Sequence, residues 1–136
     1  LLRAKLGPIQ LATGNLEFNE KAFFQILQEG ATDIIQPEIQ WCGGLTATRR
    51  IAAKAKMLNI SVIPHCAGVY NYHFVMSQSN SPFAEFISVG DGTEVKPIFT
   101  ALTGEPLPVN GRISLDPEKT GFGVQLNRDI LKPYSN

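Results

Sequence analysis

Four short apolar stretches of the sequence each have a polar residue within them or just after them, and their regular spacing is the strongest constraint on the fold. The stretches are residues 8–13, 33–38, 60–64 and 83–87. The polar residues are Asn15, Glu38, His65 and Glu85, separated by 23, 27 and 20 positions. Such spacing is typical of consecutive strand, loop and helix units in a parallel sheet. Because parallel strands bring their carboxyl ends to one face, we predict that these four side chains share a pocket.

Segments of helical periodicity connect the predicted strands. We predict helices over residues 19–29, 46–58 and 69–78. Asn19 is a suitable N-cap for the first helix, Gly30 can end it, and Asn59 can end the second. The third helix is less regular and rich in aromatic residues. The sequence thus predicts an α/β fold with four parallel strands.

The length of these units indicates part of a larger barrel. A closed eight-unit barrel needs about 250 residues, whereas the predicted units occupy roughly 90 residues here. A small doubly wound sheet is the alternative, but polar strand ends that converge on one mouth favour the barrel. We therefore expect the chain to be the C-terminal portion of something longer.

The composition changes from Gly90 onward to proline, glycine and short apolar pairs. Within this region, Asn110 and Gly111 stand between β-forming residues, which predicts a type I′ hairpin. We accordingly divide the chain into a partial (β/α)-barrel, residues 1–90, and a C-terminal loop and hairpin segment, residues 91–136, which we expect to pack on the barrel.

Charge and cysteine content exclude several classes of protein. Twelve basic and twelve acidic residues balance, and the basic ones are scattered, so we expect no nucleic-acid or membrane partner. Cys42 and Cys66 lack CxxC spacing, which argues against a disulfide framework or zinc site and indicates reduced thiols in the cytoplasm. No stretch approaches the roughly 20 apolar residues of a membrane span. The GxGxxG, Walker and GxSxG patterns are also missing.

His65, Glu38 and Glu85 together suit the removal of a proton next to a carboxylate. An imidazole titrates near neutrality, and an adjacent carboxylate raises its basicity and fixes its tautomer. A second carboxyl can hold a proton or donate a hydrogen bond, and the carbanion that forms needs a divalent cation. Alternatives stay open: His65 can be a structural histidine, the glutamates ordinary charges, and Asn15 a turn residue.

Several motifs together resemble the enolase superfamily, and within its mandelate racemase group the L-rhamnonate dehydratases. They are DIIQPEIQWCGG at 33–44, VIPH at 62–65, YNYHF at 70–74, NSPFAEF at 80–86, GEPLPVNGR at 104–112 and GFGV at 121–124. The resemblance covers nearly the whole chain. It implies the C-terminal half of an enolase-type (β/α)-barrel, strands five to eight, with a loop-rich tail that packs on the barrel and on a capping domain.

The resemblance also implies an activity, the Mg²⁺-dependent dehydration of L-rhamnonate or a related sugar acid to a 2-keto-3-deoxy acid. His65 would be the base, Glu38 the carboxylate that pairs with it, and Glu85 the carboxyl that stabilises the enediolate. Asn15 would stand at the position of a metal ligand. Barrels of this family commonly associate, so we expect a homo-oligomer of the full-length protein.

Three departures from the family pattern limit this expectation. The family usually has aspartate at the position of Glu38 and glutamate at that of Asn15, whose neutral amide would bind Mg²⁺ more weakly. The strands that carry the first two metal carboxylates, and the capping domain, lie outside these residues, so we expect them alone to be inactive. The alternatives are a non-catalytic enolase-superfamily scaffold or binding protein with a degraded metal site, and an unrelated small α/β binding protein.

Overall fold

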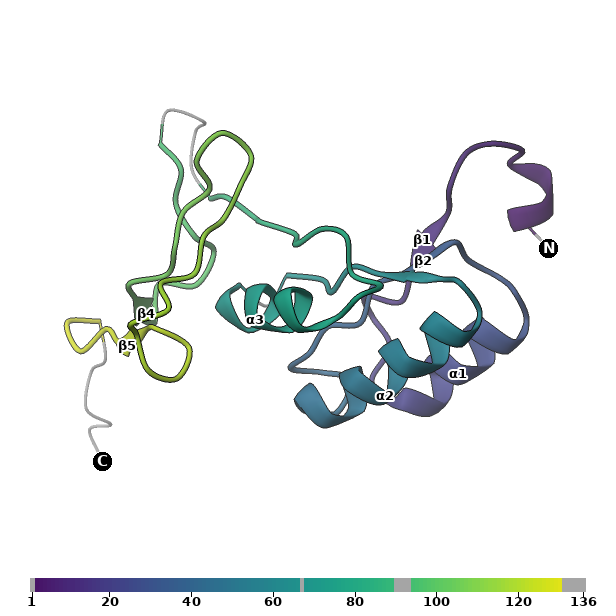
Figure 1. Ribbon diagram of the computed structural model, residues 1–136, viewed down its shortest axis with the longest axis horizontal. Helices are drawn as coiled ribbons and strands as arrows, with labels where there is room; N and C mark the ends of the chain where they lie inside the picture. The colour runs from purple at the N-terminus through teal and green to yellow at the C-terminus, as the bar shows by residue number, and fades with distance from the viewer. Residues whose placement is uncertain (1, 67, 90–93, 131–136) are drawn as a thin grey trace.

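The computed structural model describes residues 2–66, 68–89 and 94–130, and combines a parallel sheet flanked by helices with a loop-rich tail (Figure 1). Its elements in chain order are a short 3-10 helix Arg3–Lys5, β1 Ala12–Thr13, α1 Glu20–Gln28, β2 Ile34–Ile35, α2 Gly44–Met57, β3 Ser61–Val62, α3 Val69–Ser77, β4 Leu102–Thr103 and β5 Gln125–Leu126. None of the described helices is long and apolar enough to cross a bilayer.

The first three predicted strands form one parallel sheet in the order β1-β2-β3. Ala12 pairs with Ile34, and Ile35 pairs with Val62. Helices α1 and α2 run side by side on one face of this sheet (Figure 1). The prediction of consecutive parallel units is confirmed for these strands, although each regular strand is shorter than the apolar stretch that predicted it.

The fourth predicted strand, over residues 83–87, is not confirmed, because this segment forms no regular strand. These residues are extended but join no sheet, and nearby only Ser88 makes an isolated bridge, with Pro97. The Val62 N–H, on the edge of β3, donates to the carbonyl of Asn80 at 2.9 Å instead of to this segment. The Phe83 side chain is 66% exposed and therefore adds little apolar burial to this segment.

The helix ends follow the local signals in the sequence. The Asn19 side chain accepts hydrogen bonds from the N–H groups of Lys21 and Ala22, which caps α1. Gly30 and Asn59 both have positive φ, +59° and +56°, just after the last turns of α1 and α2. This left-handed residue lets the next N–H bond back to the helix and ends it. Helix α2 begins at Gly44, two residues before the predicted start.

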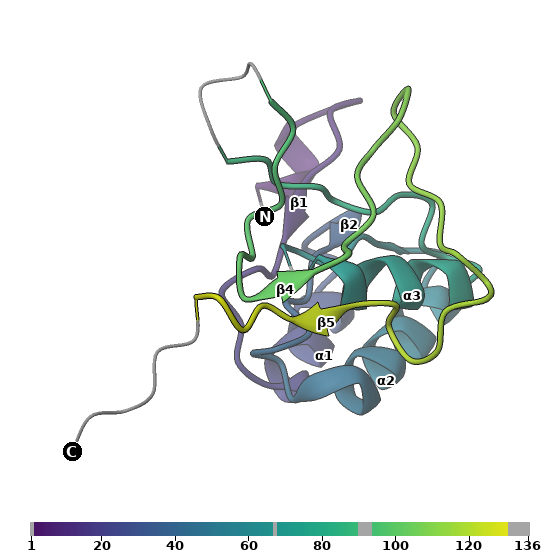
Figure 2. The ribbon, with the colours of Figure 1, turned by 90° about the vertical axis from the view of Figure 1, so that its left-hand side faces the viewer.

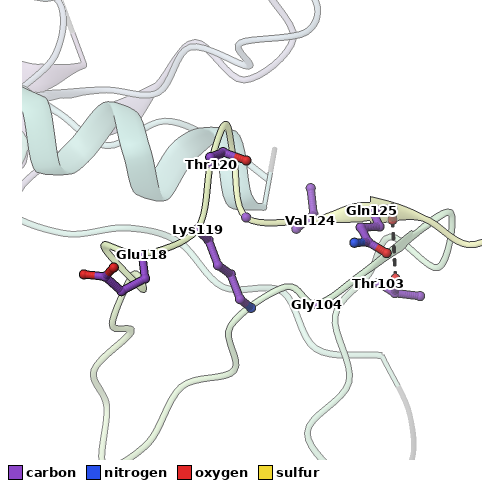
Figure 3. Close-up of a pocket in the computed structure, with 8 residues that line it drawn as sticks. Thr103, Gly104, Glu118, Lys119, Thr120, Val124 and Gln125 are labelled. Atoms are coloured by element: carbon purple, nitrogen blue, oxygen red, sulfur yellow. Dashed lines mark hydrogen bonds between the residues drawn. The ribbon is translucent and has the colours of Figure 1, made fainter.

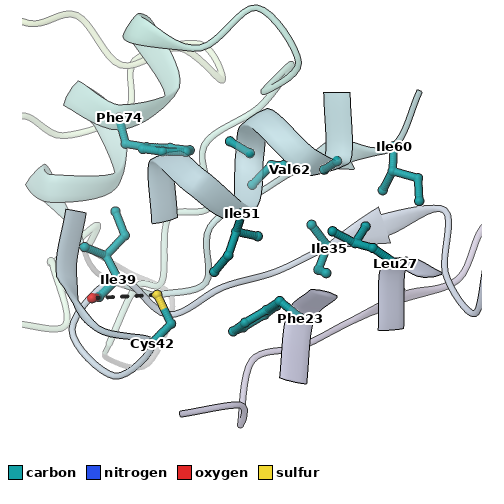
Figure 4. Close-up of a cluster of buried hydrophobic side chains, with 11 residues drawn as sticks. Phe23, Leu27, Ile35, Ile39, Cys42, Ile51, Ile60, Val62 and Phe74 are labelled. Atoms are coloured by element: carbon teal, nitrogen blue, oxygen red, sulfur yellow. Dashed lines mark hydrogen bonds between the residues drawn. The ribbon is translucent and has the colours of Figure 1, made fainter. Parts of the chain in front are cut away.

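The hydrophobic core lies between the sheet and the helices (Figure 4). Figure 4 shows Phe23 of α1 and Ile51 of α2 turned toward Ile35 of the sheet, with Phe74 of α3 at the far end of the cluster. These four side chains have almost no exposed surface. Burial of their apolar area is the main source of stability for this part of the chain.

The tail forms a small antiparallel ribbon and a hairpin beside α3 (Figure 2). Strands β4 and β5 pair through Leu102 and Leu126. The predicted type I′ hairpin is confirmed, because Asn110 and Gly111 both have positive φ, +51° and +72°, between the paired residues Val109 and Arg112.

Gly14 directly follows β1, where the chain turns away from the sheet past the Phe23 ring. Its replacement tests this part of the fold. The Cβ of Gly14→Ala would lie 2.7 Å from Cε1 of the buried Phe23 ring, at a φ of +118°. We expect a loss of about 2–4 kcal/mol in the free energy of unfolding, measured by urea denaturation of the intact protein.

Gly30→Ala is the matched control, because Gly30 also has positive φ but its Cβ would meet nothing within 4 Å. We expect a loss of only about 1–2 kcal/mol there, from the backbone conformation alone. Equal losses for the two variants would show that the contact with Phe23 does not constrain Gly14.

Candidate functional site

His65 and Glu85 form the centre of the candidate site. His65 follows β3, and its Nδ1 lies 2.8 Å from Oε2 of Glu85, with the two side chains 30% and 29% exposed. The same Glu85 oxygen accepts the backbone N–H of Cys66 at 2.6 Å. Because a carboxylate only accepts, the neutral imidazole that pairs with it carries its proton on Nδ1 and its lone pair on Nε2. The arrangement is that of a base with a fixed tautomer.

Glu38 lies at the predicted strand end but does not make the predicted contact. Its side chain is 5% exposed, and its Oε1 accepts the N–H of Gln40 at 3.2 Å. Within the described residues no ion pair joins it to His65, whose Nδ1 is taken by Glu85. In the structure Glu85, from the extended segment after α3, takes the contact with His65 that was expected of Glu38.

Burial has the largest effect on the pKa of the Glu38 carboxyl. Loss of hydration raises the pKa of the Glu38 carboxyl above its usual value. The Gln40 N–H and the His65 charge lower that pKa, and the nearby Glu85 charge raises it further. Glu38 is thus close enough to interact with both members of the His65–Glu85 pair, and its burial favours its protonated form.

Asn15 lies in the turn after β1. The Glu17 N–H donates to the Gly14 carbonyl at 3.1 Å, which closes that turn. The half-buried Asn15 carboxamide makes no hydrogen bond among the described residues. Residues 2–66, 68–89 and 94–130 hold no group of three His, Cys, Asp or Glu side chains that could bind a metal ion. The described residues therefore do not form a magnesium site by themselves.

A pair formed by the buried Tyr72 and the partly buried Glu105, which we had not predicted, joins the tail to the start of α3. The Tyr72 hydroxyl donates to Oε1 of Glu105 at 2.9 Å, and the buried Oε2 atom of Glu105 has no partner among the described residues. A Cβ on Gly68 would lie 2.9 Å from Oε1, so the carboxyl rests against the start of α3. Burial raises the pKa of Glu105, and the Tyr72 hydrogen bond lowers it. The two members of this pair lie in two of the family motifs, Tyr72 in YNYHF and Glu105 in GEPLPVNGR, but neither motif indicates that the two side chains meet.

Two cavities lie in the tail and beside α3. One, of about 560 Å³, is lined by Thr103, Lys119 and Gln125 of the ribbon and its neighbouring turn (Figure 3). The other, of about 580 Å³, is lined by Tyr72 and by Ala84 and Phe86, the residues that flank Glu85. Neither cavity is lined by any of the four predicted strand-end residues. The structure brings Glu38, His65 and Glu85 near one another, and among the described residues no hydrogen bond or ion pair joins Asn15 to them.

The sequence matches a known family along almost its whole length. A family model described as "Enolase C-terminal domain-like" matches residues 1–130. The chain belongs to the enolase superfamily. This confirms the resemblance on which the sequence analysis relied, including the mandelate racemase group and its L-rhamnonate dehydratases.

Two curated relatives of this enolase-superfamily chain are similar in sequence. An L-rhamnonate dehydratase of Saccharopolyspora erythraea is 44% identical over 140 residues, which cover 100% of this chain and 36% of the relative. A putative L-rhamnonate dehydratase of Caldivirga maquilingensis is 42% identical over 132 residues, covering 95% and 33%. The chain thus spans about a third of the length of these relatives.

Solved structures give the same result for the fold. L-rhamnonate dehydratase from Gibberella zeae superposes with a TM-score of 0.85 and 35% identity, covering 94% of this chain and 33% of the other. A second structure of rhamnonate dehydratase from that organism, complexed with Mg, also has a TM-score of 0.85 and 35% identity, covering 94% and 32%. The α/β arrangement with its parallel sheet therefore corresponds to a portion of an enolase-type structure.

The buried carboxyl of Glu38 gives a testable pH dependence of stability. Because its pKa is raised in the folded protein, the fold favours the protonated form, and ionisation above the unfolded pKa costs stability as the pH rises. Glu38→Gln keeps an oxygen for the Gln40 N–H but cannot ionise. We expect this variant of the intact protein to be more stable than the parent at pH 7 and similar to it near pH 4, measured by urea denaturation.

The decisive quantity is how much the stability difference between Glu38→Gln and the parent changes from pH 4 to pH 7. A stability difference that is the same at pH 4 and pH 7 would show that the Glu38 carboxyl is not ionised against a burial penalty.

Proposed function

We propose that this chain is the C-terminal part of an acid-sugar dehydratase that acts on L-rhamnonate or a related sugar acid. The observation that carries the proposal is the His65–Glu85 pair, 2.8 Å apart at the end of a parallel strand, in a chain whose full length aligns with L-rhamnonate dehydratases. In this proposal the β1–β3 units and the segment with Glu85 are strands five to eight of a (β/α)-barrel, over residues 1–90. Residues 91–136 are its tail.

The proposed reaction begins with proton transfer to His65. Its Nε2 removes the proton α to the substrate carboxylate, and the C–H electron pair moves into the enediolate. Glu85 holds the imidazole through Nδ1 and stabilises the imidazolium that forms. The β-carbon–oxygen bond then breaks, the hydroxyl leaves with a proton as water, and the enol tautomerises to a 2-keto-3-deoxy acid.

The structure favours a division of roles between the two carboxyls that differs from the one expected from sequence. Glu85 pairs with the base, which was the role expected of Glu38. Glu38 is buried and has a raised pKa, so it suits the acid that protonates the leaving hydroxyl or the enediolate. The two carboxyls therefore exchange roles in our proposal, while His65 keeps its role as the base.

We propose Mg²⁺ as the cofactor, with Asn15 as one oxygen ligand in a longer protein. Support comes from the Mg complex of the Gibberella zeae enzyme and from the position of Asn15 just beyond β1. Since the described residues do not form a metal site alone, we assign no step of the reaction to the metal. A non-catalytic scaffold or binding protein is the second candidate, and the neutral amide at Asn15 favours it.

His65→Asn tests the proposed base directly. The intact protein is incubated with Mg²⁺ and a panel of sugar acids that includes L-rhamnonate, and 2-keto acid is measured by its absorbance as a semicarbazone. We expect kcat to fall about 10²–10⁴-fold in the variant, with little change in KM, because a general base acts in the transition state. No keto acid from the parent protein with any member of the panel would favour the binding protein instead.

Asn15→Glu tests the proposed metal ligand. A carboxylate adds charge to the oxygen that binds a hard cation, so we expect Mg²⁺ affinity to rise at least about 10-fold, measured by titration calorimetry of the intact protein. Asn15→Gln is the matched control, with the same length as glutamate and no charge. A gain in affinity that the two variants share, or that neither shows, would remove Asn15 from the metal site.

A further inference from the structure

The peptide bond that joins Pro64 to His65 is held at both of its ends. The His65 N–H donates to the Pro37 carbonyl of the neighbouring strand at 3.0 Å. The Pro64 carbonyl accepts Nδ2 of Asn71 at 3.1 Å. One bond therefore fixes this peptide to the segment after β2, and the other fixes it to α3. The main chain that carries the His65 side chain is thus restrained from two independent elements.

Asn71 is an unusual residue for its position. Its side chain is 0% exposed, and it lies in the first turn of α3 between the buried Val69 and Phe74. Its Oδ1 atom is buried and has no hydrogen-bond partner among the described residues. Burying an unpaired amide oxygen is unfavourable, and an apolar side chain of similar size would avoid it. Packing alone therefore does not account for asparagine here, whereas donation to Pro64 does.

We propose that Asn71 is a positioning residue, which orients His65 by holding the Pro64–His65 peptide plane. This inference rests on the proposed function, in which His65 is the base. If the Pro64 carbonyl loses Asn71, the peptide can rotate about the bond it keeps with Pro37. The His65 ring then moves relative to Glu85, and Nε2 no longer points reliably at the substrate. A misplacement of about 1 Å in such a group can cost about 10²-fold in rate.

The chain offers a matched control in Asn80. Its Nδ2 also donates to main-chain carbonyls beside β3, to Ala52 at 3.1 Å and to Ile60 at 3.3 Å. Ile60 lies before β3, at the end of the strand away from His65. Asn71→Leu and Asn80→Leu therefore remove the same kind of bond from opposite ends of one strand. Only the Asn71 bond restrains the peptide that carries His65.

Activity of the intact protein on its sugar acid is the first measurement. For Asn71→Leu we expect kcat to fall about 10–100-fold with KM within about 2-fold, and the acid limb of the kcat profile against pH to shift, because the His65–Glu85 contact is disturbed. For Asn80→Leu we expect a lower melting temperature with the pH profile unchanged. A loss of kcat that is equal in both variants, with unshifted profiles, would overturn the proposal.

The second measurement does not depend on activity and separates this inference from the proposed function. The proton on His65 Nδ1, bonded to Glu85, gives a downfield resonance in the NMR spectrum, assigned by its loss in His65→Asn. We expect Asn71→Leu to weaken or move it and Asn80→Leu to retain it. If the parent protein dehydrates no sugar acid but the resonance responds this way, the proposed function fails and the positioning role stands.

A retained resonance in Asn71→Leu, at the parent position, would overturn the positioning role whether or not the protein is a dehydratase. Should the leucine variant fail to fold, Asn71→Ser provides the same comparison. Its shorter hydroxyl cannot span the distance to Pro64 and bonds within its own helix turn instead. The expected changes in kcat and in the His65 resonance are the same for this variant.

Discussion

The parallel pairing of the second and third strands is the constraint on which the site depends. Regular pairing covers only two residues of each strand, but the ladder continues past them, with the Ile63 N–H on the Ile35 carbonyl and the His65 N–H on the Pro37 carbonyl, both at 3.0 Å. This register brings His65 level with Glu38 on the neighbouring strand. A shift of the register by one residue would turn the imidazole to the opposite face of the sheet.

The loop after β3 connects the two parts of the fold. Its start is held by Glu85, which accepts the Cys66 N–H, and its end by Gly68, which rests against Glu105 of the tail. Tyr72 completes the connection through its hydroxyl. The tail therefore contacts α3 through Tyr72 and also contacts Gly68, which immediately precedes this helix.

Several polar groups that are wholly or partly buried carry an energetic cost. Burial raises the pKa of Glu38, and among the described residues Asn71, Ser81 and Glu105 each keep one buried oxygen without a partner. The hydrophobic cluster around Phe23 and Ile51 lies on the helical side of the sheet and supports it. Glu38, Asn71 and Glu105 lie around the loop at the carboxyl end of the sheet, where unfavourable groups are expected at a functional site.

The sequence by itself determined the local and periodic features. The cap at Asn19, the helix ends at Gly30 and Asn59 and the turn at Asn110 each follow from one side chain or one backbone preference, so no distant contact was needed to predict them. The order of the first three strands followed from their spacing. Membership of the enolase superfamily followed from the combined motifs, since they report the whole fold at once.

Only the tertiary structure decided which groups meet. From the sequence alone, Glu38 and Glu85 are both suitable partners for His65. In the structure, the extended segment after α3 passes where its Glu85 contacts His65. The same path kept residues 83–87 out of the sheet, because strand pairing depends on what lies along the edge of β3 and not on apolar content. Asn71 was missed for a similar reason: it stands within an aromatic helix, and its bond to Pro64 exists only because that helix folds back over β3.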